Sequence, residues 1–345
     1  MNLIQGGAQF DPGRRVLYLL EPGHKFTTRN QSFSVKRDDE SEIIAIPHHR
    51  IGRIEIGPGV TYDEKSVNLA LNKNIELIII DGFGQTKGTL SNNKTKRAAL
   101  QLSQARSVLD EIFRLEISRK LVDARIRNQR TQIKRLSRNK TSEDIERVLG
   151  VMKHDLHKIP YAQTINALRG LEGATAARYW PILGILMKQD RFKRTRPAQD
   201  AHNATINYMT AILERDIRAA IQSCALHIGF AYLHASRDRQ DGLVYDLMEP
   251  FRAALTEGLA VFLFNSKRLR DDMFASSLLR EIDISKQGRH AIINGYESAV
   301  ARRINKPKDK SKLSWRAMMI YQASTLSKAI QAEDPQLFIP YLMET

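Results

Sequence analysis

Cysteine is nearly absent from this chain, because Cys224 is the only one among 345 residues. A single thiol cannot close an internal disulfide, and it cannot supply a thiolate cluster for a metal ion. Its apolar neighbours predict that Cys224 is a small core residue in the middle of an apolar helix. Such sparing use of cysteine fits a protein of the reducing cytoplasm.

Long hydrophobic runs are also missing. No apolar stretch approaches the length that a membrane-spanning helix requires. Residues 1–7 lack the charged start and the long apolar run of a secretory signal. We therefore expect no membrane association and a cytoplasmic location.

Acidic side chains are too few to balance the basic ones: 38 Asp and Glu face 54 Lys and Arg, a formal net charge of +16. Such an excess favours a polyanionic partner, and its clustering favours nucleic acid. One cluster lies in the helical stretch 114–140, where Glu116 and Asp123 pair with part of it, so a solvated helix face is the alternative. A second basic run, 302–312, predicts a basic loop. The candidate nucleic-acid contacts in the first cluster are Arg119, Lys120, Arg125 and Arg130.

The hydrophobic pattern changes near residue 92. Before it, short alternating or apolar runs predict β-strands, together with one helix at 61–74 that is capped by Thr61 or Asp63. From Ala98 onward, apolar residues recur at three- and four-residue spacing, which indicates helices. The sequence thus predicts an α+β fold, with a small β-rich domain at 1–92 and a larger all-α domain at 93–345. The predicted strands are 16–20, 32–36, 42–47, 53–57, 76–81 and 87–90.

Glu172 lies in a predicted helix of apolar and small residues, where a buried carboxylate is costly unless a cation compensates it. The alternative is a carboxylate near a helix N-terminus, which the helix dipole stabilises without any ligand. Asp246 and Glu249 are three residues apart, so a helix places both on one face, where they repel each other unless a cation lies between them. A solvated acidic patch, or pairing of Glu249 with Arg252, is the alternative there.

His234 ends a predicted apolar helix at 225–233, on roughly the same face as His227. A single histidine on such a helix is more often structural than a metal ligand. Carboxylate oxygens and an imidazole nevertheless suit a hard or borderline divalent cation, and a cation on a basic surface suits phosphodiester chemistry.

Four stretches stand in a specific order: INALRGLEGA at 165–174, NATINY at 203–208, GFAYLH at 229–234 and DLMEPFR at 246–252. With them, the chain resembles the CRISPR-associated integrase of the adaptation step, the larger subunit of the spacer-acquisition complex. The resemblance runs from about Val16 to the C-terminus.

The resemblance implies a small β-domain that forms a homodimer, a helical catalytic domain, and a small companion subunit. By position, Glu172, His234 and Glu249 match the family's ligands for Mn²⁺ or Mg²⁺, and Asp246 matches an additional acidic residue near the metal. Residues on motif positions near the site are assigned to site support or DNA contact. These are Arg178, Tyr179, Asn203 and Tyr208.

The implied reaction is strand transfer, in which the 3′-hydroxyl of a protospacer end attacks a phosphodiester of the CRISPR repeat. Three other interpretations remain open. They are a metal-dependent nuclease that acts on branched DNA or RNA, a non-catalytic DNA-binding scaffold, and an RNA-binding accessory protein.

Overall fold

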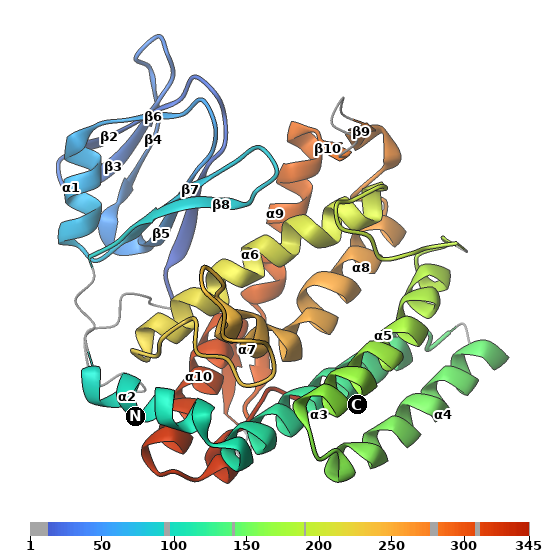
Figure 1. The fold of residues 1–345 in the computed structure, drawn as a ribbon. Coiled ribbons are helices and arrows are strands. Elements are labelled where there is room, and N and C mark those ends of the chain that lie inside the picture. Colours follow the sequence, from blue (N-terminus) through green and yellow to red (C-terminus); the bar gives the residue numbers. More distant parts are fainter. Residues whose placement is uncertain are drawn as a thin grey trace. The chain divides into compact units, whose positions relative to one another are not determined.

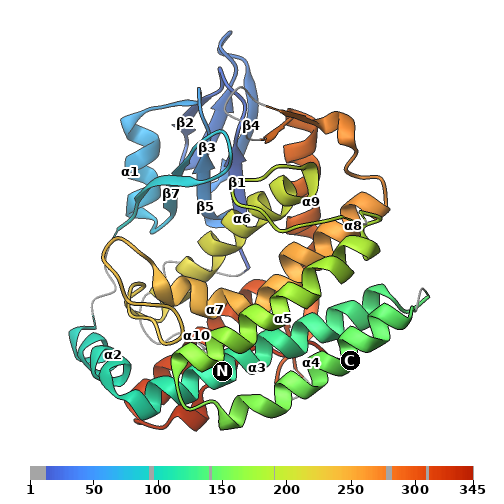
Figure 2. The same ribbon diagram turned by 45° about the vertical axis from the view of Figure 1, so that its right-hand side comes forward.

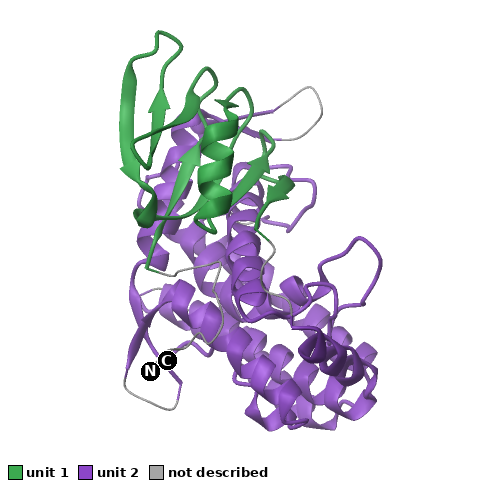
Figure 3. Cartoon of the chain, turned by 90° about the vertical axis from the view of Figure 1, so that its left-hand side faces the viewer, with its two compact units in different colours: residues 1–96 green, residues 97–345 purple. Residues whose placement is uncertain are grey.

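The computed structural model describes residues 13–92, 97–139, 142–189, 191–276, 282–307 and 311–344. The chain divides into two compact units, residues 1–96 and 97–345 (Figure 3). The first is β-rich and the second is largely helical, so the predicted α+β fold class is confirmed. Residues 1–7, and residues 93–96 directly after the first predicted domain, lie outside the described residues. Within the described ranges, no helix has both the length and the apolar character needed to cross a bilayer.

In its described part, residues 13–92, the first unit consists of two four-stranded sheets and one helix. One sheet has the order β1-β5-β7-β8, in which β1, β5 and β7 are parallel and β8 is antiparallel to β7; the other has the order β4-β3-β2-β6. The strands are β1 (Arg15–Leu19), β2 (Lys25–Arg29), β3 (Ser32–Lys36), β4 (Glu42–Pro47), β5 (Ile51–Ile56), β6 (Thr61–Tyr62), β7 (Glu76–Ile80) and β8 (Thr86–Leu90).

Helix α1 (Glu64–Asn72) covers this core, which both sheets line with buried apolar residues such as Phe26, Phe33 and Leu77. Of the two predicted caps, Asp63 is the one used, because its side chain accepts the backbone N–H of Ser66 at 2.8 Å. Strand β2 was missed, since Lys25–Arg29 has one apolar residue and gives no alternating signal.

The second unit is built around one long helix, α3, which packs against α2, α4, α5 and α7 (Figures 1 and 2). Two short antiparallel pairs accompany the helices, β9 (Phe274–Ser276) with β10 (Ile282–Ile284) and β11 (Arg303–Asn305) with β12 (Lys312–Ser314), so this unit is not purely α-helical. The helices are α2 (Ala98–Leu109), α3 (Glu111–Leu136), α4 (Glu143–Lys158), α5 (Ile165–Leu186), α6 (Ala201–Ser223), α7 (Gly242–Arg252), α8 (Leu259–Asn265), α9 (Lys286–Val300) and α10 (Trp315–Gln331).

Side-chain caps fix where the helices around the site begin. Asp110 accepts the N–H groups of Ile112 and Phe113 at the start of α3. Thr164 and Asp200 cap α5 and α6 in the same way. These caps satisfy backbone donors that a helix N-terminus leaves unpaired, and they set the register in which each helix presents its polar residues.

The predicted helix at 225–233 is wrong. Helix α6 ends at Ser223, and Ala225 takes a left-handed conformation with φ of 59°. The N–H of Leu226 bonds the carbonyl of Ile221, and that of Ala225 bonds Gln222, which is the Schellman pattern of helix termination. Cys224 is therefore the C-cap of α6 rather than a mid-helix residue, and His234 lies on an irregular segment that shares no helical face with His227.

The second basic run, predicted as a loop, is partly in strands: Arg303–Asn305 form β11, and Lys312 begins β12, which pairs with it. Residues 308–310 of this run lie outside the described residues. The alternating pattern of Arg303–Asn305 and Lys312–Ser314 is only three residues long on each side, too short for a sequence-based strand prediction.

Candidate metal centre

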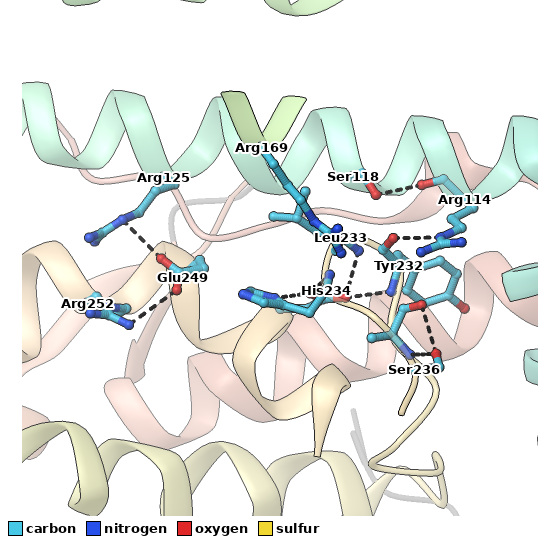
Figure 4. A network of polar contacts seen from close by, with 12 residues as sticks. Arg114, Ser118, Arg125, Arg169, Tyr232, Leu233, His234, Ser236, Glu249 and Arg252 are labelled. Carbon is cyan, nitrogen blue, oxygen red and sulfur yellow. Dashed lines mark hydrogen bonds and ion pairs between the residues drawn. The ribbon is translucent and has the colours of Figure 1, made fainter. Parts of the chain in front are cut away.

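Three elements bring the predicted ligands into one region. Glu172 lies on α5, His234 on the irregular segment before α7, and Asp246 and Glu249 on α7 itself. Figure 4 shows His234, and Glu249 with Arg125 and Arg252 beside it. The charges of Glu172, His234 and Glu249 influence one another's pKa, which places the three groups within electrostatic reach. Residues far apart in the sequence are thus brought near one another, although the described side chains do not converge closely enough to enclose a metal ion.

Asp246 is completely buried, and the segment that carries His234 wraps around it. Its carboxylate accepts backbone N–H bonds from Tyr232 (2.6 Å), Leu233 (3.0 Å) and His234 (2.9 Å), and it bonds the Nδ1 of His234 at 2.6 Å. A carboxylate only accepts hydrogen bonds, so Nδ1 carries the hydrogen and the lone pair of the neutral ring is on Nε2. Asp246 therefore holds the histidine in the tautomer that ligates through Nε2.

The environment of His234 favours its protonated form. Burial works against a charged ring, but the hydrogen bond and charge of Asp246, with the charges of Glu249 and Glu172, raise the pKa of His234 above its ordinary value. A metal ion that binds Nε2 must displace this proton, so ligation competes with protonation.

Glu249 lies between two arginines. Its carboxylate pairs with the Nε of Arg125 at 3.0 Å and with Arg252 at 3.3 Å. Burial alone would raise the pKa of Glu249, but Arg252 and Arg125 outweigh it and lower that pKa below its ordinary value. The pairing of Glu249 with Arg252, an alternative from the sequence, does occur, and it leaves Glu249 ionised and able to act as a ligand.

Glu257 completes this charge cluster and was not predicted. It is fully buried and binds Arg125 through two bonds, of 2.6 and 3.2 Å, while its distance to Arg252 is 3.6 Å. Residues eight apart on a regular α-helix differ by about 80° in direction, so periodicity gave no reason to pair Glu257 with Glu249. The π-helical segment Ala253–Gly258 between α7 and α8 accommodates one additional residue and brings Glu257 round to the same arginine.

Glu172 is the eighth residue of α5, beyond the first turn, so the helix-dipole interpretation of this carboxylate is wrong. Burial raises the pKa of Glu172, and the charge of Glu249 raises it further, against the opposing effects of Arg125, His234 and Arg252. Glu172 thus has a raised pKa near Glu249, whose pKa is lowered. A bound cation would favour the ionised form of both carboxylates.

Positive charge borders this site on a segment that sequence reasoning passed over. The fully buried Asn203 holds the segment 193–195. Its side-chain oxygen accepts hydrogen bonds from the Arg194 guanidinium at 2.8 Å and from the backbone N–H of Thr195 at 3.0 Å. Its side-chain nitrogen donates to the carbonyl of Lys193 at 2.8 Å. Burial and the charges of Arg196 and Arg252 lower the pKa of Arg194 to about 9. Amides rather than carboxylates hold this guanidinium, so the segment keeps its net positive charge beside Glu249.

The basic residues predicted on α3 make internal contacts. Arg125 is 4 % exposed and belongs to the charge cluster. Arg119 donates to the carbonyl of Ala162, Lys120 to those of Gln336 and Phe338, and Arg130 to that of Leu149. A helix in the centre of its unit has little free surface, so these contacts support packing; phosphate contact by this helix stays a prediction.

The remaining motif residues differ in burial and in their contacts. Tyr179, Asn203 and Tyr208 are buried, which agrees with site support more than with a surface contact to DNA. Arg178 is exposed on α5 and bonds the buried carboxylate of Asp155 at 2.9 Å. Burial and the charge of Glu257 raise the pKa of Tyr179 well above its ordinary value, so its phenol stays protonated.

The donor set fits a divalent cation by its chemistry. Two carboxylates and an imidazole whose Nδ1 is held by another carboxylate are a common ligand combination for a hard or borderline metal ion. In the part of the chain that the structure describes, however, no three His, Cys, Asp or Glu side chains converge closely enough to enclose a metal ion. The ligands are thus oriented toward one region without forming a closed cage.

Comparisons with known proteins agree with this architecture. The sequence profile of the family described as CRISPR associated protein Cas1 matches residues 17–298, which include Glu172, His234, Asp246 and Glu249. A similar protein, CRISPR-associated endonuclease Cas1 1 from Moorella thermoacetica, is 26% identical over 95% of this chain and 98% of its own length.

Two solved structures share the fold. A casposase bound to an integration product has a TM-score of 0.80 and 20% identity, covering 93% of this chain and 91% of its own. A chain of a Cas6-RT-Cas1–Cas2 complex has a TM-score of 0.81 and 22% identity, covering 99% of this chain and 37% of its own. At these identities the structural similarity establishes the fold alone.

Proposed function

Because this chain belongs to the Cas1 family of CRISPR-associated endonucleases, we propose that it joins protospacer 3′-hydroxyl ends to the CRISPR repeat by metal-dependent transesterification. The observation that carries the proposal is the hydrogen bond between His234 and Asp246. Asp246 binds the Nδ1 of His234, which leaves Nε2 as the ring nitrogen that can ligate a metal ion, within electrostatic reach of Glu172 and Glu249. Glu172, His234 and Glu249 would hold Mn²⁺ or Mg²⁺. Such a cation would supply Lewis-acid activation of the hydroxyl and neutralise charge that develops on the phosphate.

The other residues prepare the site for that chemistry. Asp246 orients the imidazole and does not itself need to bind the cation. Arg125 and Arg252 keep Glu249 ionised. Arg194 and Arg196 place positive charge where the phosphates of two DNA substrates would approach, and a basic segment of this kind lowers the repulsion between them.

The partners follow from the same assignment. The related Cas1 chain of known structure belongs to a complex with Cas2, which supports a small companion subunit for this chain, and the casposase structure contains an integration product, which supports a DNA substrate. A homodimer formed through the β-rich unit, and action in the cytoplasm, complete the proposal.

The test is strand transfer of a labelled protospacer into a supercoiled plasmid that carries the repeat, with Mn²⁺ or EDTA and with or without the companion subunit. Wild-type protein and Glu146→Gln, an exposed carboxylate on α4, should give joined product that depends on the metal ion. Glu172→Gln and His234→Gln should give none, since each loses one ligand.

Two results would contradict the proposal. Cutting of the plasmid in Mn²⁺ without any joining would favour a metal-dependent nuclease. Tight DNA binding with neither cutting nor joining, under conditions where the companion subunit is bound, would make it a scaffold.

A further inference from the structure

The segment that carries His234 has no regular secondary structure, yet side chains from three helices, α3, α5 and α7, hold its backbone. Arg169, on α5, donates to the carbonyl oxygen of Leu233 through both Nε (2.9 Å) and Nη2 (2.6 Å) (Figure 4). Arg169 lies three residues, or about one helical turn, before Glu172. One turn of α5 therefore carries the predicted metal ligand Glu172 and also Arg169, which bonds the residue directly before the predicted ligand His234.

The carbonyl of Leu233 and the N–H of His234 belong to the same peptide unit, which is planar and rigid. Asp246 accepts that N–H at 2.9 Å, while Arg169 donates to that carbonyl. In a trans peptide these two groups point in opposite directions, so the two side chains hold the plane from opposite edges. Rotation of the plane would break both contacts.

The preceding peptide unit is held in the same manner. Arg114, on α3, donates through Nε to the carbonyl of Tyr232 at 2.8 Å, and Asp246 accepts the N–H of Leu233 at 3.0 Å. Asp246 thus faces two arginines across two successive peptides. These bonds hold the two peptide units that precede the side chain of His234, and the bond from Nδ1 to Asp246 then holds the imidazole ring.

We propose that Arg169 is a positioning residue of the candidate metal centre, which holds the Leu233–His234 peptide against Asp246 and thereby sets the place of the imidazole relative to Glu172. Arg169 needs to touch neither the metal ion nor DNA. Arg114 has the same role one peptide farther from the ring, so its effect is smaller. The proposal rests on the proposed function only where the metal ion is concerned. The backbone clamp, by which we mean the bonds of Arg169 and Asp246 to the Leu233–His234 peptide, is independent of that function.

The test compares Arg169→Gln and Arg169→Lys with Arg114→Gln and a control, Arg289→Gln. Arg289 also donates to a backbone carbonyl, that of Ile284 at 2.7 Å, but it lies on α9 away from this segment. The first measurement is Mn²⁺ affinity of the full chain without DNA, by calorimetric titration. Groups that orient a metal ligand change affinity by about 10–100-fold, so we expect a loss of that size for Arg169→Gln and less than about twofold for Arg289→Gln.

The second measurement is the nitrogen NMR spectrum of the histidine rings in metal-free protein, assigned with His234→Gln. Wild type should show a single His234 signal with the hydrogen on Nδ1, and Arg169→Gln should show a shifted or divided signal. Lysine can still donate one bond to the carbonyl, so Arg169→Lys should recover part of both effects, which a purely structural role would not require.

Unchanged Mn²⁺ affinity together with an unchanged His234 signal in Arg169→Gln would overturn the proposal, and so would equal effects in the Arg289→Gln control. Absence of Mn²⁺ binding in the wild type would count against the proposed function. In that case the His234 signal alone decides whether the clamp exists. If Arg169→Gln does not fold, Arg169→Lys supplies both measurements.

Discussion

Removal of the Glu257 charge should destabilise the helical unit strongly. The cluster holds two positive and two negative side chains. The exposed fractions of the side chains alone are 5 % for Arg125, 12 % for Arg252, 7 % for Glu249 and 0 % for Glu257. Glu257→Gln keeps the size of the side chain but turns a neutral buried cluster into one with a charge of +1. Breaking a buried ion pair from one side costs about 3–5 kcal/mol, because the partner is left uncompensated.

That loss converts into a measurable melting shift. A unit of about 250 residues has an unfolding entropy of roughly 0.5 kcal/mol/K, so 3–5 kcal/mol corresponds to a fall of about 6–10 °C. The assay is thermal unfolding followed by circular dichroism, with Asp272→Asn as a control. Asp272 pairs with Arg270 in an exposed bridge, and its loss should give no resolvable shift.

A double variant tests the reasoning from the other side. Arg125→Met with Glu257→Gln removes one charge of each sign and leaves Arg252 facing Glu249. We expect it to melt several degrees above the value obtained by adding the two single effects. Strict additivity, or a fall of less than about 2 °C for Glu257→Gln alone, would refute the view that these four charges act as one compensated cluster.

Two further predictions concern single residues. Gly184→Ala should lower the free energy of unfolding by about 1–3 kcal/mol, because the new methyl group would lie 2.6 Å from Cβ of Phe192. Gly150→Ala, whose methyl group would meet nothing within 4 Å, should raise it by about 0.5–1 kcal/mol. Chemical denaturation of both variants measures these changes, and equal effects would contradict the prediction. Burial raises the pKa of the Cys224 thiol to about 11. Alkylation of Cys224 at pH 8 should therefore run roughly 100-fold slower than that of an exposed thiol, and it should accelerate as the pH rises toward 11. Fast labelling of the folded protein at pH 8 would contradict this prediction.

The candidate residues of the site could be named from the sequence because they are marked by residue types and their order; their role as metal ligands stays a prediction. Glu172, His234 and Glu249 stand in distinctive sequence words, and the structure brings them within electrostatic reach. The role of Asp246 as the group that orients His234 was not visible in the sequence. It depends on three backbone N–H groups that no pattern of side chains encodes.

The errors have identifiable physical causes. The false helix at 225–233 arose because Ala225 occupies a left-handed position where glycine would have signalled the end of α6. Helix α3 was predicted to contact nucleic acid because its arginines outnumber its acids, and that contact stays a prediction; what the sequence did not show is the internal pairing of these arginines. Within the fold, buried Arg125 is neutralised by Glu249 and Glu257, more than 120 positions farther along the chain. Charge counted over one helix cannot show compensation by another.

The measurement that tests the central claim most directly is Mn²⁺ binding to the protein without DNA, by calorimetric titration of wild type, Glu172→Gln, Glu249→Gln and the exposed control Glu146→Gln. If Glu172, His234 and Glu249 hold the cation, wild type and Glu146→Gln bind Mn²⁺ alike, and both ligand variants lose that binding. Equal Mn²⁺ affinity in all four proteins would contradict the account.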